Sequence, residues 1–205
     1  MIVRTEMDQE LRLIVWETTE TTDDLLKELH CPQSIAEYSR LTSEKRRKEF
    51  LAVRVALKRA LGKEHVIIYD NDGKPYLSDN CFNISISHSG SWVAVVLHPA
   101  RPVGIDLECV GKKVQRVYKR FLCAEEQNHL LGDKSVEKLH IAWSAKEAAY
   151  KIIGKEAVDF STQLYVEPFE VKEKGKLITI HTTSGKKYYF DYLQAENYVL
   201  VYGIG

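Results

Sequence analysis

The chain has 205 residues, 44% of them hydrophobic and 28% charged, so it is long enough to bury one substantial core or two small ones. Its 29 basic and 29 acidic residues give a formal net charge of zero, which excludes a bulk electrostatic attraction to nucleic acid or an anionic membrane. Because the sequence shows no signal peptide, no Cys-x-x-Cys pair and no run near the roughly 20 apolar residues of a membrane helix, we expect a cytoplasmic protein with reduced thiols and no membrane partner.

Periodicity and turn residues predict the elements of the first hundred residues in chain order. They are a strand at 11–15, helices at 22–30, 32–40 and 43–62, and strands at 66–69, 82–87 and 92–97. Ser43 is a suitable N-cap for the long helix, and Gly62 is a suitable left-handed residue at its end. Turns are predicted at 71–73 and 88–90.

The same reasoning applied to the remaining residues predicts a mixed second half. Its elements are a strand at 103–108, a basic helical segment at 112–120, helices at 124–131 and 135–153, and a strand-rich end with turns at 174–175 and 184–185.

A short internal similarity bears on the architecture. Residues 56–64 (ALKRALGKE) align with residues 148–156 (AAYKIIGKE), an offset of 92 residues. Two amphipathic helices that end in Gly-Lys-Glu also resemble each other by chance, and this alternative stays open. The duplication hypothesis predicts an α+β fold of two similar α/β halves, residues 1–100 and 101–205, related by a pseudo-twofold axis. The active site would then lie in the cleft between the halves.

Two acidic residues share one face of the predicted strand at 103–108 (VGIDLE). Strand period two places Asp106 and Glu108 together, while Ile105 and Leu107 point toward the core. Carboxylates this close repel each other unless a cation lies between them, so a divalent ion with oxygen ligands is a natural partner. A strand end with a solvated acidic face is the alternative.

A second chemical stretch, WSAKEAAYK at 143–151, has helical periodicity. Trp143, Glu147 and Lys151 are four residues apart and therefore share one helix face. An ordinary surface pair between Glu147 and Lys151 explains the two charges but leaves Trp143 without a role.

Together, the two stretches resemble the phosphopantetheinyl transferases of the Sfp type. That family's signatures read (V/I)-G-(I/V)-D-(I/L)-E and W-(S/T)-x-K-E-(A/S)-x-x-K. Both are matched in full, and Glu147 lies 39 positions after Glu108. Further agreement comes from residues 73–75 (GKP) and from residues 82–90 (FNISISHSG), which resemble the family's F-N-(I/L)-S-H-S-G with two residues inserted. The resemblance covers the chain from about residue 43 to residue 155.

The resemblance implies a magnesium-dependent transferase that uses coenzyme A as co-substrate. It implies that Asp106, Glu108 and Glu147 bind Mg²⁺, which grips the pyrophosphate of coenzyme A, and that Lys151 neutralises charge on the bridging phosphates. The residues that match nucleotide contacts are Arg47, Arg54, Lys74, Ser87 and His88. For His88 alone, a structural histidine is the ordinary interpretation, but its position in a Ser-His-Ser-Gly turn favours an anion contact.

The implied reaction is attack by a serine hydroxyl of an apo carrier protein on the β-phosphate of coenzyme A, with adenosine 3′,5′-bisphosphate leaving. The residues at 121–126 (FLCAEE) fit the family pattern F-(F/L)-x-x-x-E, so Glu126 is a candidate base. Glu147 and a metal-bound water are the rivals, and the sequence leaves the three open.

A basic cluster is the candidate docking surface for the acidic helices of an acyl, peptidyl or aryl carrier protein. Its members are Lys112, Lys113, Arg116, Lys119 and Arg120. A solvated basic face is the alternative. By resemblance we expect a monomer, since one chain supplies both halves. A noncatalytic coenzyme A-binding scaffold of a synthase system is the alternative function, and such a module would not need Glu147 and Lys151 together.

Overall fold

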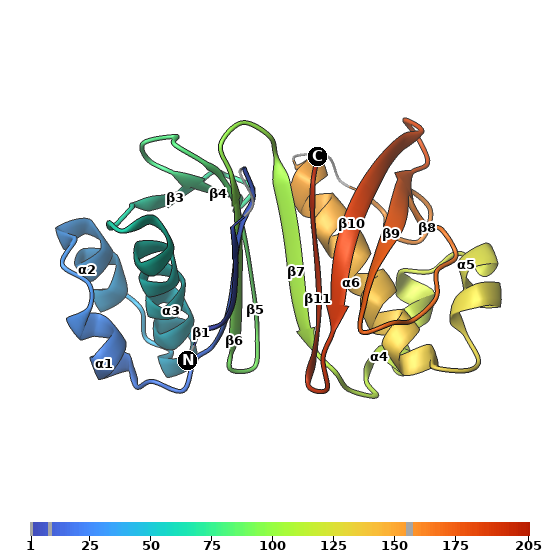
Figure 1. Cartoon of the computed structure of the whole chain (residues 1–205), viewed down its shortest axis with the longest axis horizontal. Helices are drawn as coiled ribbons and strands as arrows, with labels where there is room; N and C mark the ends of the chain where they lie inside the picture. The colour runs from blue at the N-terminus through green and yellow to red at the C-terminus, as the bar shows by residue number, and fades with distance from the viewer. Residues whose placement is uncertain (1, 8–9, 155–157) are drawn as a thin grey trace. The chain divides into compact units, whose positions relative to one another are not determined.

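The computed structural model describes residues 2–7, 10–154 and 158–205 (Figure 1). The chain divides into two compact units, Met1–Ala100 and Arg101–Gly205, each with its own sheets and helices. Within the described parts of the chain, no helix is long and apolar enough to cross a membrane.

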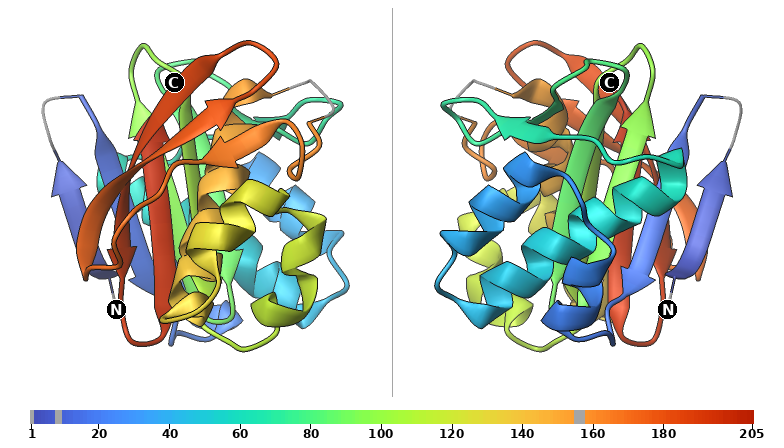
Figure 2. Two further views of the ribbon diagram at one scale, coloured as in Figure 1. Left: turned by 90° about the vertical axis from the view of Figure 1, so that its right-hand side faces the viewer. Right: turned by 90° about the vertical axis from the view of Figure 1, so that its left-hand side faces the viewer.

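The N-terminal unit is built on a four-stranded antiparallel sheet with the order β1-β2-β6-β5. Its strands are β1 (Ile2–Met7), β2 (Arg12–Glu17), β5 (Asn83–Ser89) and β6 (Trp92–His98). A separate two-stranded sheet pairs β3 (Ile67–Tyr69) with β4 (Pro75–Leu77). The helices are α1 (Thr22–Lys27), α2 (Pro32–Ser39) and α3 (Glu44–Leu61), and they gather on one face of the larger sheet (Figure 2, right).

Helix α3 has the ends that its sequence predicts. The Ser43 hydroxyl accepts a hydrogen bond from the backbone N–H of Arg46 at 3.4 Å, and Gly62 ends the helix with a φ of 77°. One side of α3, including Leu51 and Val55, packs into a core with Trp16 and Val95 of the sheet. Burial of each large apolar side chain contributes about 1.5–3 kcal/mol, which holds the helix against the sheet.

The C-terminal unit carries a five-stranded antiparallel sheet with the order β7-β11-β10-β9-β8. Its strands are β7 (Val103–Cys109), β8 (Leu164–Val166), β9 (Lys174–His181), β10 (Lys186–Gln194) and β11 (Tyr198–Ile204). The helices are α4 (Val114–Val117), a 3₁₀ turn (Tyr118–Arg120), α5 (Ala124–Leu130) and α6 (Ser135–Ile153), and Figure 2 (left) shows this unit from their side.

The mixed α+β class is confirmed, and two local predictions are wrong. Strand β5 continues through Ser89, which pairs with Trp92, so the turn is at Gly90 and Ser91. Residues 174–175 lie inside β9 and do not form a turn. The basic segment predicted at 112–120 is helical as expected, in the form of the short helix α4 followed by one 3₁₀ turn.

Both units repeat one feature of topology. In each, the strand before the long helix pairs antiparallel with the last strand, β2 with β6 and β7 with β11. The pseudo-twofold axis and the cleft between the halves stay predictions. In the internal similarity, Lys155 and Glu156 lie outside the described residues.

Candidate active site

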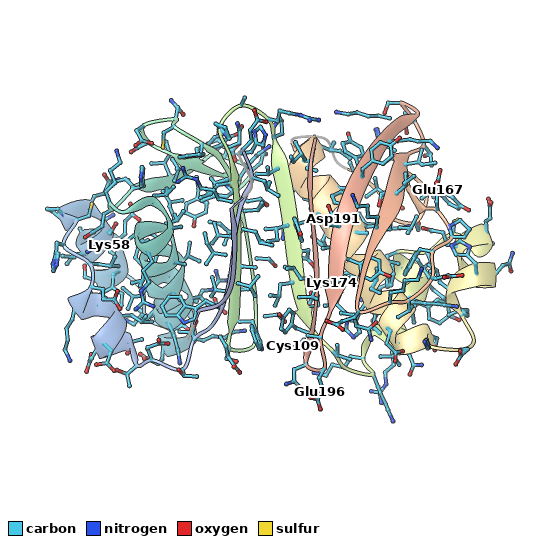
Figure 3. All side chains as sticks on the ribbon, in the orientation of Figure 1. Lys58, Cys109, Glu167, Lys174, Asp191 and Glu196 are labelled. Atoms are coloured by element: carbon cyan, nitrogen blue, oxygen red, sulfur yellow. The ribbon has the colours of Figure 1, made fainter. Side chains whose placement is uncertain are left out.

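Strand β7 and helix α6 lie unusually close together, and Gly104 is the reason. A Cβ atom at this position would lie 2.1 Å from the carbonyl oxygen of Ala148 in α6, so only glycine permits this approach. Because side chains on a strand alternate, Asp106 and Glu108 project from the same face as Gly104 and therefore toward α6. The acidic pair follows Gly104 along β7, which ends at Cys109 (Figure 3).

Trp143 orients the second of these acids. Its indole N–H donates a hydrogen bond to a Glu108 carboxylate oxygen at 3.3 Å. The ring is fixed by an edge contact with Phe121 and a tilted contact with Phe160, with centroid distances of 5.1 and 5.6 Å. The hydrogen bond to Glu108 thus gives Trp143 a role on this helix face that a surface ion pair between Glu147 and Lys151 does not explain.

Lys151 pairs with the first acid. Its ammonium group donates to Asp106 at 2.9 Å and to the backbone carbonyl of Ile105 at 2.7 Å. Asp106 is buried, with 5% of its surface exposed, so the predicted wet acidic face is not what the strand presents at this position. The ion pair observed for Lys151 is therefore with Asp106 and connects α6 to β7; it is not the predicted surface pair with Glu147.

Glu147 titrates far from its ordinary range. Burial raises the pKa of its carboxyl group to about 7, and the negative charges of Asp106 and Glu108 add to this, while Lys151 opposes it. The three acids therefore interact electrostatically, and a proton on Glu147 relieves the repulsion near neutral pH. A divalent cation would relieve it more strongly.

The donor set fits a hard cation in its chemistry, because it offers carboxylate oxygens and a partly exposed position. Its present arrangement is looser than a closed site. Among the described residues, a different group, formed by His65, Asp79 and Cys81, has all its donor atoms within 4.8 Å of one another. Lys151 occupies the place beside Asp106, so cation binding requires a shift of side chains around this carboxylate.

A pocket of about 410 Å³ opens beside Glu147 in the same unit. Its apolar lining includes Trp143, Phe121 and Phe160, and besides Glu147 it has one positive and one negative side chain, Arg120 and Asp159. A pocket of this kind suits an uncharged, flexible chain that ends in a charged group at Glu147.

Glu126, the other candidate base, is completely buried and has a full set of partners. One carboxylate oxygen accepts the backbone N–H of Cys123 and the other that of Val166, both at 2.9 Å. The ammonium group of Lys146, also fully buried, lies 2.7 Å from the carboxylate. This geometry argues for a structural role and against contact with a substrate.

Lys146 lies beside Glu147 in the motif but is not among the site residues predicted from sequence. Burial lowers the pKa of Lys146, and the charge of Glu126 opposes this shift. The ammonium group also donates to the backbone carbonyls of Phe121, Phe160 and Leu164 at 2.5–2.8 Å. Lys146 therefore ties α6 to the two segments that supply Phe121 and Phe160 to the pocket.

His88 takes part in a small charged cluster of the N-terminal unit. Its Nδ1 lies 3.4 Å from Glu49, and the Lys45 ammonium lies 3.6 Å from the same carboxylate oxygen. A pocket of about 190 Å³ at this place is lined by Lys45, Lys48, Glu49 and Trp92, among others. Lys45 and Lys48 are therefore candidate anion ligands that the sequence analysis did not name, although the run EKRRK at 44–48 was a visible signal.

The other predicted nucleotide contacts have varied environments. Arg54 is buried, donates to Glu37 at 2.9 Å and stacks on the Phe50 ring, so its guanidinium joins α2 to α3 and is not exposed to a ligand. Arg47 donates to the carbonyl of Leu41. Lys74 follows the turn between β3 and β4, and Ser87 is buried within β5.

The basic cluster is exposed at all five positions. It lies on the segment between β7 and α5, and Arg120 also lines the pocket beside Glu147. A partner that bound this surface would therefore contact the rim of that pocket.

Comparisons with known proteins agree with this geometry. Residues 102–202 match the family model described as ACPS, the 4′-phosphopantetheinyl transferase superfamily. The chain is similar to the 4′-phosphopantetheinyl transferase psf-1 of Bacillus pumilus, with 35% identity over 102 residues, 47% of this chain and 43% of that protein. It is also similar to the 4′-phosphopantetheinyl transferase Sfp of Bacillus subtilis strain 168, with 37% identity over 84 residues, 40% of this chain and 36% of that protein.

The matched segment thus spans less than half of the length of these two relatives. It includes the whole of β7 and α6, and with them the acidic strand, Glu147, Lys146 and Lys151. Residues 102–202, just under half of the chain, therefore belong by their sequence pattern to the 4′-phosphopantetheinyl transferase superfamily.

Proposed function

We propose that the protein transfers the 4′-phosphopantetheine arm of coenzyme A to a serine hydroxyl of an apo carrier protein and releases adenosine 3′,5′-bisphosphate. The observation that carries this proposal is the interaction of Glu147 with Asp106 and Glu108 across β7 and α6, inside the segment that matches the superfamily. The similar proteins from Bacillus are named for this transfer, which supports the assignment.

Asp106, Glu108 and Glu147 are the residues that would hold Mg²⁺. When bound, the ion would supply positive charge to the pyrophosphate of coenzyme A. Trp143 keeps Glu108 oriented for this role, and release of Asp106 from Lys151 frees one ligand. The Lys151 ammonium would then be available to the phosphate that leaves with the nucleotide, where negative charge grows during transfer.

The pantetheine arm fits the apolar pocket beside Glu147. The aromatic side chains of Phe121, Trp143 and Phe160 provide an apolar wall for its amide-linked chain, and the phosphate end lies toward Glu147. Of the candidate bases, Glu147 lines this pocket and Glu126 does not. We therefore assign acceptance of the serine proton to Glu147 and a structural role to Glu126.

The nucleotide end is assigned to the cluster around His88 in the N-terminal unit. A 3′-phosphate dianion would replace the carboxylate of Glu49 as the partner of His88 and Lys45. Lys48 lines the same pocket, and Lys74 and Arg47 complete the proposed contacts. Arg54 is left out because its guanidinium is buried against Phe50 and Glu37.

The exposed basic cluster is the proposed docking surface for the carrier protein. Its five positive charges suit an acidic helix, and Arg120 connects the surface to the pocket where the serine would react. Binding through exposed charges falls with ionic strength, so rising salt should raise KM for the carrier more than KM for coenzyme A.

Mass spectrometry of an apo carrier protein incubated with coenzyme A, Mg²⁺ and this protein tests the function. A phosphopantetheine adduct is expected with the wild type, and its loss is expected without Mg²⁺ or with Glu147→Gln. Binding of coenzyme A without any adduct, across acyl, peptidyl and aryl carrier proteins, would instead support the noncatalytic scaffold. Glu125→Gln is a matched control, because Glu125 lies on the exposed side of α5 and bonds only Tyr165 among the contacts observed.

A further inference from the structure

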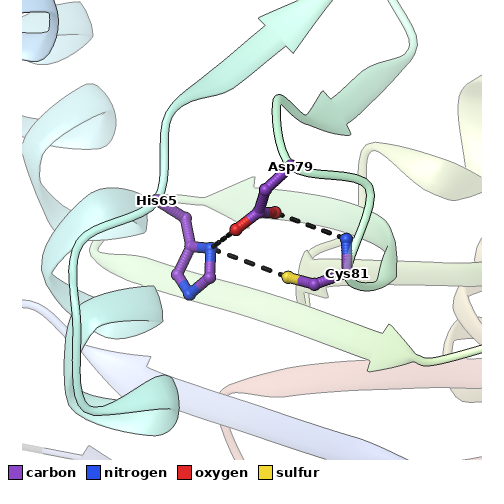
Figure 4. Close-up of side chains that lie close together, drawn as sticks. All are labelled: His65, Asp79 and Cys81. Carbon is purple, nitrogen blue, oxygen red and sulfur yellow. Dashed lines mark hydrogen bonds and ion pairs between the residues drawn. The ribbon is translucent and has the colours of Figure 1, made fainter.

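Three potential metal ligands meet at the open end of the small sheet in the N-terminal unit (Figure 4). His65 lies just before β3, and Asp79 and Cys81 lie just after β4. The ladder pairs Ile67 with Leu77, and the Ser78 N–H donates to the Val66 carbonyl at 2.9 Å, so the chain segments on both sides are held together. His65 thereby becomes a neighbour of Asp79 and Cys81, which lie 14 and 16 positions later in the sequence.

The distances between the donor atoms resemble those around a tetrahedral ion. Nδ1 of His65 lies 2.9 Å from Oδ2 of Asp79 and 3.7 Å from Sγ of Cys81, and all three donor atoms lie within 4.8 Å of one another. Zinc bonds of about 2.0–2.3 Å at tetrahedral angles separate N, O and S ligands by about 3.3–3.7 Å. Small rotations of the two exposed side chains, Asp79 and Cys81, would reach that spacing.

The negative charge at this cluster is on the carboxylate of Asp79. Burial raises the pKa of the Cys81 thiol to about 11, and the carboxylate of Asp79 adds to this shift. The thiol is therefore protonated at neutral pH and is a poor nucleophile, which excludes a Cys-His-Asp catalytic role for the cluster as it stands. The nearest observed positive side chain, Lys63, lies 3.9 Å from Asp79 and is mostly exposed, so it offers little compensation.

We propose that His65, Asp79 and Cys81 form a binding site for one Zn²⁺ ion, with a fourth position open to water. Sulfur, imidazole nitrogen and carboxylate oxygen together are typical of zinc and disfavour Mg²⁺ or Ca²⁺. The reaction is balanced by loss of one proton: Zn²⁺ replaces the thiol hydrogen of Cys81, which passes to solvent.

The histidine tautomer is compatible with this site. Ligation by Nδ1 requires the proton on Nε2, and among the described residues Nε2 of His65 makes no hydrogen bond that such a change would break. The side chain of His65 is only 2% exposed, which fixes the ring, whereas 42% of the Asp79 side chain is exposed and leaves an entry path. Bound zinc would link the residues flanking β3 and β4, whose connecting turn carries Lys74.

Cobalt is the probe that tests the site, because thiolate-bound Co²⁺ has an intense near-ultraviolet charge-transfer absorption that oxygen-bound Co²⁺ lacks. Reduced, chelator-treated full-length protein would be titrated with Co²⁺ in excess Mg²⁺, which occupies the carboxylates of the C-terminal unit. We expect one thiolate-bound Co²⁺ per chain, displacement by one equivalent of Zn²⁺, and release of about one proton per metal in weakly buffered solution.

The variants separate this site from other thiols and from the proposed transfer reaction. Cys81→Ser removes an exposed thiol and should abolish the absorption, whereas Cys31→Ser, at a partly buried cysteine of the same unit, should retain it. Glu147→Gln should lose transfer activity and keep the zinc site, so the two proposals fail independently. No thiolate absorption in the wild type, or full absorption in Cys81→Ser, would show only a hydrogen-bonded cluster and overturn the proposal.

Discussion

Removal of the charge on Glu126 should destabilise the protein strongly while sparing its chemistry. The buried ammonium of Lys146 lies 2.7 Å from Glu126, and neither side chain is exposed. Glu126→Gln keeps the shape of the side chain but leaves this cation without a counter-charge, which typically costs about 3–5 kcal/mol. For a chain of this size, that loss corresponds to a fall in Tm of roughly 6–20 °C.

The pH dependence of this loss gives a second signature. Burial holds the pKa of Lys146 in the folded state below its ordinary value of 10.5. Between these two pKa values the unfolded chain binds more protons, so the contribution of Lys146 to stability increases as pH rises through the window. Without Glu126 the folded-state pKa falls further and the window extends toward neutral pH. The difference in stability between wild type and Glu126→Gln should therefore shrink as pH rises.

Urea unfolding and turnover measured on the same samples test this reasoning. Glu125→Gln, one residue away and exposed, should change stability by less than about 0.5 kcal/mol. Adding Lys146→Met to Glu126→Gln should recover part of the loss, because the uncompensated charge is gone. A Glu126→Gln variant that stays fully folded but loses about 10²–10⁴-fold in kcat would refute the structural role and restore Glu126 as the base.

Three further outcomes are expected. Mg²⁺ should raise Tm more at about pH 8 than at about pH 6, because the Glu147 carboxyl must lose its proton to bind the ion and its pKa without the ion is about 7. Thermal scans of Glu147→Gln should not show this difference. Lys151→Ala should lower kcat by about tenfold or more with a smaller change in the Kd of coenzyme A, and a pure KM effect in steady-state kinetics would assign Lys151 to ground-state binding instead. His88→Ala should reduce kcat/KM for coenzyme A by roughly 10- to 150-fold, and Glu49→Gln should increase it. Neither change should much affect kcat/KM for dephospho-coenzyme A. Equal effects on both substrates would return His88 to a structural role.

The elements nearest the chemistry could be predicted from sequence because local signals agreed there. Helix α6 runs from Ser135 to Ile153 as its periodicity predicts, and β7 contains the whole VGIDLE stretch. The turn predicted at residues 174–175 failed because Gly175 is a close-approach residue. A Cβ there would lie 2.5 Å from the Tyr192 ring, so glycine serves strand packing and does not mark a turn.

The roles of two charged residues could not be read from the motifs. The motif drew attention to Glu147 and Lys151, yet Lys146 lies three residues after Trp143 and seven after Leu139, which places it on the buried side of α6. Glu126 is the third residue of α5, and it accepts the N–H of Cys123 at the start of that helix. A capping box usually begins with Ser or Thr, so Cys123 gave no sequence signal for this geometry. Its pairing with Lys146 depends on tertiary contacts that no local pattern contains.

The contact between Gly104 and Ala148 has a consequence for how the acidic centre is assembled. Since backbone meets backbone there, the spacing between the strand acids and Glu147 is fixed by main-chain atoms and not by flexible side chains or loops. The entropy of bringing these two stretches of backbone together is thus lost once, during folding. Connections elsewhere in the C-terminal unit, including the exposed segment with the basic cluster, can therefore change in sequence without altering this spacing.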